Sequence, residues 1–159
     1  MSGGNSAEKA VEELLRRKWT ISFAESCTGG MAAAALVDVP NASAVFESSF
    51  VTYSNEAKMQ HLGVKAESLQ KWGAVSETVA IEMAAGAAKA AGAQVGIGIT
   101  GIAGPTGGTE EKPVGTVCFG FFLDGKTCTA TRQFGDLGRT AVRRMAVEYA
   151  YQTLLLLLG

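Results

Sequence analysis

The chain has 159 residues, of which 47% are hydrophobic and 18% are charged, a balance typical of a globular domain rather than a disordered segment. Its net charge is −1, from 14 basic and 15 acidic residues, so nothing supports a broad nucleic-acid surface. Its longest C-terminal apolar run, Leu154 to Leu158, is too short to span a membrane. Three scattered cysteines and one histidine, His61, offer no disulfide framework and no metal-ligand cluster. We therefore expect a cytoplasmic protein without a bound metal, and with neither nucleic acid nor membrane as a partner.

The first residues form a polar segment, 1–6, that we expect to be disordered ahead of one domain over 7–159. Asn5 is a candidate cap for a first helix, because Glu8 follows three residues later. Basic residues at 16–18 suit the C-terminal end of that helix, where positive charge is favourable.

A serine at a sharp strand-to-helix turn comes next. The apolar run Ile21 to Ala24 predicts a buried strand, and the Ala-rich run Met31 to Val37 predicts a helix. Ser26 lies between them, so its hydroxyl and the N–H groups of the helix start could face a ligand. The arrangement resembles a nucleophile elbow, although the literal Gly-x-Ser-x-Gly pattern is absent. The alternative is an ordinary capped helix with Ser26 or Thr28 as N-cap, and these residues alone leave both interpretations open.

The middle of the chain predicts one strand and three helices. Val45 to Ser54 contains β-forming residues and predicts a second strand. Asn55 to His61 and Ala66 to Trp72 predict short helices. A long Ala-rich helix then runs from the cap Ser76 to about Gly92.

Tyr53 and Lys58 place a phenol and an ammonium group within about one helical turn of each other. A serine nucleophile needs a base, and a triad could use only His61, for which the sequence offers no marked acidic partner. A lysine serves instead if desolvation lowers its pKa by about three units, and Tyr53 could then relay the proton or hold the lysine. The alternative, which the spacing alone favours, is a solvated helix start with Lys58 exposed.

Gln94 to Thr100 predicts a central strand that leads into a glycine-rich loop, Gly101 to Pro113. Residues 96–101 match Gly-x-Gly-x-x-Gly, but they lie within the strand and open no helix, so tight packing is the better interpretation. The loop leaves the carboxyl end of a predicted parallel strand, as the Ser26 turn does. If the two strands are neighbours, both loops face one crevice. The alternative is that the glycine-rich loop is an ordinary surface loop.

Val114 to Leu123 and Lys126 to Phe134 predict a hairpin around Asp124-Gly125. The last helix is expected from about Gly138 to Leu158, with Arg139 and Arg143 one turn apart near its start. Positive charge there opposes the helix dipole, so an anion is one explanation and a solvated arginine pair is the other.

Helices that alternate with strands, followed by a hairpin, predict an α/β fold: a three-layer α/β/α sandwich with a mixed, mostly parallel sheet of about five strands.

Five stretches together resemble the C-terminal domain of the competence/damage-inducible protein CinA family, in its stand-alone form, from about residue 7 to the end. They are Ala24–Gly30, Phe50–Lys58, Gly73–Ser76, Gly101–Pro105 and Glu111–Val117. The resemblance implies nicotinamide mononucleotide deamidase activity, which hydrolyses the carboxamide to nicotinate mononucleotide and ammonia in pyridine nucleotide recycling. It implies an α/β/α fold and neither a metal nor a cofactor. Nicotinamide mononucleotide is the expected small-molecule partner.

The same resemblance assigns roles to individual positions. Ser26 matches the nucleophile, and Tyr53 and Lys58 match the groups that activate it. The expected substrate-binding residues are Thr28, Gly29, Gly30, Thr100, Gly101, Gly104 and Arg139. The chain departs from the family pattern in the loop before the last helix, which lacks a proline, and in carrying Ser48-Ser49 where a glycine is common.

A function of another class stays open at this point. The chain could be a catalytically silent nucleotide-binding or regulatory module linked to competence or DNA damage, which would keep the glycine loops and Arg139 without needing Ser26. The Ala-rich helix and the leucine-rich end also make a homo-oligomer an expectation.

Overall fold

The computed structural model describes residues 6–159, so residues 1–5 of the expected disordered segment and the expected Asn5 cap lie outside the described residues. Ser6 is the first residue of helix α1. The elements in chain order are α1 (Ser6–Arg17), β1 (Ile21–Glu25), α2 (Met31–Val37), the 3-10 helix η1 (Ala42–Ala44), β2 (Phe50–Val51), α3 (Asn55–Leu62), α4 (Ala66–Trp72), α5 (Glu77–Ala91), β3 (Val95–Gly101), β4 (Thr116–Leu123), β5 (Lys126–Gln133) and α6 (Arg139–Leu158).

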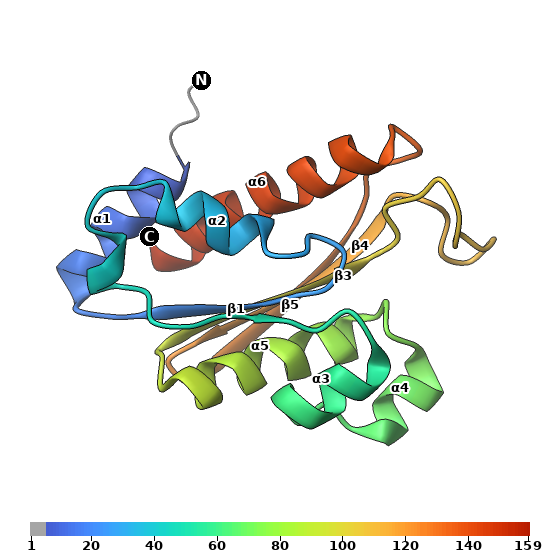
Figure 1. The fold of residues 1–159 in the computed structure, drawn as a ribbon, viewed down its shortest axis with the longest axis horizontal. Coiled ribbons are helices and arrows are strands. Elements are labelled where there is room, and N and C mark those ends of the chain that lie inside the picture. Colours follow the sequence, from blue (N-terminus) through green and yellow to red (C-terminus); the bar gives the residue numbers. More distant parts are fainter. Residues whose placement is uncertain (1–5) are drawn as a thin grey trace.

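The five strands form one sheet in the order β2-β1-β3-β4-β5 (Figure 1). β1 pairs in parallel with both β2 and β3, whereas β3–β4 and β4–β5 are antiparallel pairs. Four strands therefore run in one direction and β4 runs against them. This confirms the predicted mixed, mostly parallel sheet, with the late hairpin formed by β4 and β5.

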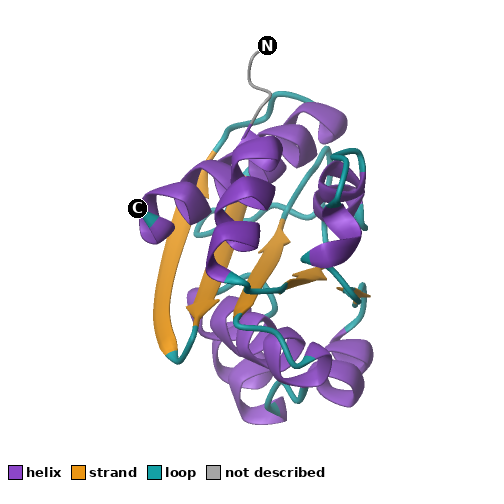
Figure 2. Cartoon of the chain, turned by 90° about the vertical axis from the view of Figure 1, so that its left-hand side faces the viewer, coloured by secondary structure: helices purple, strands orange, loops and turns teal. Residues whose placement is uncertain are grey.

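Helices cover both faces of this sheet, which confirms the predicted three layers. Helices α3, α4 and α5 lie on one face, and α1, α2 and α6 lie on the other (Figure 1). Figure 2 shows the same layering from the side, with strands between two groups of helices. Among the described residues, no helix is both long and apolar enough to cross a bilayer.

Strand glycines let α5 approach the sheet closely. A Cβ built on Gly96 would collide with the carbonyl oxygen of Ala84, and one on Gly98 or Gly120 with that of Ala80. The helix backbone therefore lies directly on the strands, and its alanines fill the interface without pushing it away. The Gly-x-Gly pattern of β3 is thus a packing feature, as the sequence predicted.

The second strand is much shorter than the predicted Val45 to Ser54, because serine groups replace part of its ladder. The Phe23 N–H donates to the Ser49 hydroxyl at 2.8 Å, and the Ser22 hydroxyl donates to the Ser48 carbonyl at 2.8 Å. Regular pairing with β1 is left to Phe50 and Val51. The Ser48-Ser49 departure from the family pattern lies at this irregularity.

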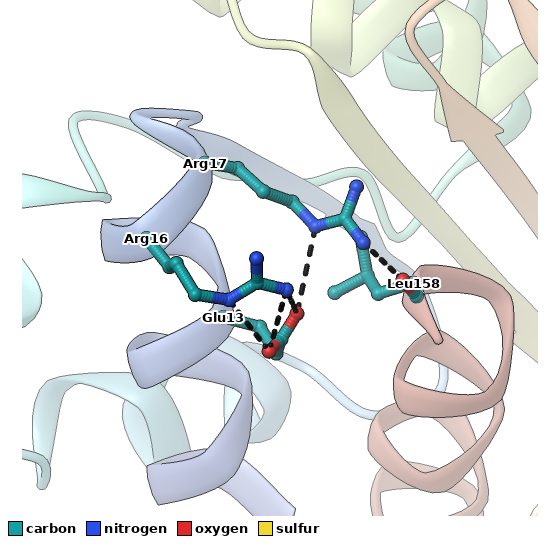
Figure 3. A network of polar contacts seen from close by, with 4 residues as sticks. All are labelled: Glu13, Arg16, Arg17 and Leu158. Carbon is teal, nitrogen blue, oxygen red and sulfur yellow. Dashed lines mark hydrogen bonds and ion pairs between the residues drawn. The ribbon is translucent and has the colours of Figure 1, made fainter.

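Helix α1 is tied to the end of α6. Glu13 pairs with Arg16 at 2.6 Å, and Arg17 donates to the carbonyl oxygen of Leu158 (Figure 3). Surface ion pairs of this kind contribute little, so burial of apolar side chains such as Leu14 carries most of this interface. The contact fixes the far end of the helix whose first turns reach the site described next.

Candidate active site

A cavity of about 270 Å³ lies at the carboxyl ends of β1 and β3, just below the ~300–1,000 Å³ range of small-molecule sites. These strands are neighbours, and the Ser26 N–H donates to the Ile99 carbonyl at 3.0 Å. The Ser26 turn and the glycine loop after β3 therefore face one crevice. The lining residues are Ser26, Cys27, Tyr53, Asn55, Lys58, Ala74, Val75, Thr100, Gly101, Ile102, Ala103, Gly104, Thr106, Gly107 and Arg139.

Lys58 is a buried partner of Ser26. Its side chain is 2% exposed, and its Nζ donates to Ser26 Oγ at 3.0 Å and to the Thr52 carbonyl at 2.8 Å. The N-cap Ser54, which accepts from the Ala57 N–H, starts α3 so that Lys58 points inward. Burial lowers the pKa of Lys58, because desolvation disfavours the ammonium form. The interpretation of Lys58 as a solvated surface residue is therefore wrong.

Cys27 and His61, the other nearby candidates for a nucleophile and a base, do not suit those roles. Burial raises the pKa of the Cys27 thiol to about 11, so at neutral pH it is a protonated, unreactive group. His61 is exposed on α3 and, within the described part of the chain, has no hydrogen bond to Ser26. Ser26 and Lys58 are therefore the candidate nucleophile–base pair.

The start of α2 is closed to ligands by a residue that sequence reasoning missed. Both oxygens of the fully buried Glu25 carboxylate accept backbone N–H groups, from Ala32 and Ala33, at 2.9 Å each. The expectation that these N–H groups face a ligand is therefore wrong. The N-cap alternative is wrong too, because the cap position is Gly30 and no side chain caps it. The sequence signal that could have revealed this contact was Glu25 itself, an acidic residue directly after the apolar run Ile21 to Ala24.

Three expected substrate-binding residues of the turn lie outside the cavity lining. Thr28 is fully buried, and its Oγ1 has no partner among residues 6–159. A Cβ on Gly29 would meet Arg143, and one on Gly30 would meet Val51. The turn folds toward α6 and β2, and the structure does not bring these three residues to the crevice.

Arg139 and Arg143 have different surroundings although they are one turn apart. Arg139 lines the cavity and donates to the Gly104 carbonyl and to the Tyr53 hydroxyl, each at 2.7 Å. Arg143 donates to the carbonyl oxygens of Cys27 and Thr28, at 2.9 and 3.1 Å. Arg139 is thus available to a ligand, whereas Arg143 holds the backbone of the Ser26 turn.

Tyr53 and Thr100 line the cavity, but each bonds to a group other than the Ser26–Lys58 pair. Tyr53 is 62% exposed, and no hydrogen bond joins its hydroxyl to Ser26 or Lys58 in the described structure. Its expected contact with the lysine is replaced by the contact with Arg139. Thr100 is buried, and its hydroxyl donates to the Ala74 carbonyl at 3.0 Å. Across residues 6–159, no three His, Cys, Asp or Glu side chains gather as metal ligands.

Known proteins with the same fold and sequence pattern cover nearly the whole chain. The family model described as the CinA C-terminal domain matches residues 4–158. Nicotinamide-nucleotide amidohydrolase PncC of Escherichia coli is 51% identical over 148 residues, which cover 93% of this chain and 90% of that protein. A CinA-like protein of Kosmotoga olearia is 53% identical over 149 residues, and there the match spans only 36% of the longer relative.

Solved structures agree with these sequence matches. The competence/damage inducible protein CihA of Agrobacterium tumefaciens superposes with a TM-score of 0.94 at 40% identity, covering 97% of this chain and 94% of that one. A CinA superfamily protein of Enterobacter cloacae gives 0.95 at 35% identity, covering 100% and 94%. Sequence and fold agree, and the chain therefore belongs to the CinA C-terminal domain family.

Proposed function

We propose that this chain is a nicotinamide-nucleotide amidohydrolase that uses Ser26 as nucleophile and Lys58 as its base. The observation that carries the proposal is the 3.0 Å contact between Lys58 Nζ and Ser26 Oγ in the cavity of about 270 Å³. The 51% identity to the Escherichia coli protein named nicotinamide-nucleotide amidohydrolase supports the substrate. A catalytically silent regulatory module would not need a buried lysine that is hydrogen-bonded to the serine.

In the first half of the reaction, neutral Lys58 accepts the Ser26 proton while Oγ attacks the carboxamide carbon. A C–O bond forms and the carbonyl π electrons move to oxygen. The Cys27 N–H, next to the nucleophile, has no acceptor among the residues described and is a candidate donor to that oxyanion. Collapse of this intermediate breaks the C–N bond, Lys58 returns the proton to nitrogen, and ammonia leaves an ester on Ser26.

In the second half, a water molecule occupies the place of the departed ammonia. Lys58 takes a proton from this water as its oxygen attacks the ester carbon, and the Cys27 N–H again stabilises the charge. Collapse breaks the bond to Ser26 Oγ, which recovers its proton from Lys58. The products are the pyridine carboxylate and the restored enzyme, so water and amide are converted to acid and ammonia.

Arg139 and the glycine loop are our candidates for anchoring the nucleotide. Arg139 is the cation that lines the crevice besides Lys58, and it is held by Tyr53 and by the Gly104 carbonyl. A guanidinium matches the geometry of a phosphate, which the substrate carries at its 5′ position. Tyr53 would then position Arg139 and the substrate rather than activate Ser26.

Ammonia release from nicotinamide mononucleotide, measured in the presence of a chelator, tests this function. We expect activity in the wild type and in His61→Ala, and loss of activity in Ser26→Ala and Lys58→Ala. Binding of the nucleotide without ammonia release would favour the regulatory module instead. An inactive His61→Ala protein would contradict the role of Lys58 as base.

Two further expectations belong to this proposal. We place the reaction in the cytoplasm, where the three free cysteines stay reduced. We also infer self-association through α6, which exposes Met145, Leu156 and Leu157. Light scattering of the wild type beside Leu156→Lys measures that association, and a monomeric wild type would contradict it.

A further inference from the structure

Glu25 connects the nucleophile directly to the start of α2. It precedes Ser26, its backbone lies in the sheet between β2 and β3, and its side chain is fully buried. Its two oxygens accept from Ala32 and Ala33 at 2.9 Å each. A shift of α2 along its axis would therefore pull on the residue next to Ser26.

Arg143 holds the other side of the same turn. Its Nε and Nη2 donate to two successive carbonyl oxygens, those of Cys27 and Thr28. Arg143 is absent from the cavity lining, unlike Arg139, so its charge acts on the protein backbone and not on a molecule in the crevice.

These contacts fix the orientation of the Cys27–Thr28 peptide, which directly follows the Cys27 N–H. In a trans peptide the C=O and N–H bonds point in opposite directions, and the Cys27–Thr28 peptide is trans. Because Arg143 binds the Cys27 carbonyl, the Thr28 N–H points away from Arg143. Cys27 lines the cavity, and its N–H has no acceptor within residues 6–159.

We propose that Arg143 and Glu25 are positioning residues, which hold the turn so that the Cys27 N–H stabilises the oxyanion formed by attack of Ser26. The inference rests on the proposed amidase function. It assigns the two residues an effect on the transition state, which carries the negative oxygen, and little effect on substrate binding.

Kinetics of Arg143 variants test this assignment. Misplaced donors cost roughly 30- to 100-fold in rate, so we expect Arg143→Ala to lower kcat by that factor and to leave KM within about threefold. Arg143→Lys should recover little of the lost kcat, because an ammonium group cannot reproduce the paired hydrogen bonds of the guanidinium to two successive carbonyl oxygens. Arg144→Ala, at the exposed next position of α6, is the matched control and should keep wild-type kcat and KM.

Two measurements separate positioning from general damage to the fold. Guanidinium ion added to Arg143→Ala should restore part of kcat, because it can refill the same two-carbonyl site, and it should not help Arg144→Ala. Glu25→Gln keeps the side-chain volume but replaces one acceptor by a donor, so kcat should fall by about tenfold with KM nearly unchanged.

Hydrogen exchange over residues 25–34 gives a result that needs no substrate. We expect faster exchange in Arg143→Ala than in wild type, with Arg144→Ala unchanged. Wild-type kcat in Arg143→Ala, or unchanged exchange of this segment, would overturn the inference. A wild type that releases no ammonia would refute the proposed function instead, and exchange would still decide whether Arg143 holds the turn.

Discussion

Replacing Lys58 with methionine should separate catalysis from stability. Methionine keeps an unbranched side chain of similar length in the buried position and removes only the amine. A positioned general base contributes about 10²- to 10⁴-fold, so we expect kcat for ammonia release to fall by that factor.

The effect of Lys58→Met on folding should be small, because two contributions oppose each other. The buried Thr52 carbonyl loses its 2.8 Å partner, at about 1–3 kcal/mol, whereas Ser26 Oγ, which loses its 3.0 Å partner, is half-buried and faces the cavity. Removing the desolvated ammonium group of Lys58 stabilises the folded protein by a comparable free energy. A net change within about 2 kcal/mol corresponds to a melting shift of at most about 8 °C.

The pH dependence of this stability has a definite sign. The pKa of Lys58 is lower in the folded protein than in the unfolded chain, so the unfolded chain binds more protons between the two values. The free energy of unfolding of the wild type should therefore increase as pH rises from the folded pKa of Lys58 to its unfolded value of about 10.5. Urea unfolding from pH 7 to 10 should show this gain in wild type relative to Lys58→Met. A variant with more than a tenth of wild-type kcat, or identical pH profiles of stability, would refute the reasoning.

Three other substitutions or modifications test separate parts of the structure. Arg139→Ala should raise KM at least about tenfold with a smaller change in kcat, because it removes a charged contact to the phosphate; a pure kcat effect would contradict this role. Gly98→Ala should destabilise the protein by about 2–4 kcal/mol in urea unfolding, since its Cβ collides with the Ala80 carbonyl, and unchanged stability would refute that close approach. Iodoacetamide at pH 8 should modify exposed Cys128 well before buried Cys27, whose pKa is about 11, as intact-protein mass would show; the reverse order would contradict the assignment of Cys27 as inert.

Local signals explain why so much of the fold could be predicted. Ser54 and Ser76 each accept an N–H three residues later, and the helices that they cap begin where the sequence placed them. The Asp124-Gly125 turn joins β4 and β5 because both residues adopt positive φ. Such features depend on neighbours in the chain, so sequence order alone reveals them.

The features that escaped prediction depend on contacts distant in sequence. The second strand shortens because Ser49 bonds to Phe23, 26 residues away. Arg143 reaches Cys27 across 116 residues, and only the family resemblance, not the local pattern, distinguished Arg139 from Arg143. Glu25 caps α2 from inside a strand, a role that no local capping pattern describes.

Hydroxylamine competition tests the covalent role of Ser26 most directly. During turnover of nicotinamide mononucleotide, hydroxylamine should intercept the Ser26 ester and yield the hydroxamate of the nucleotide beside the carboxylate. The hydroxamate share should rise with hydroxylamine concentration, and Ser26→Ala should form neither product. Ammonia release by wild type without any hydroxamate, or formation of the carboxylate by Ser26→Ala, would contradict the acyl-enzyme and indicate direct attack by water.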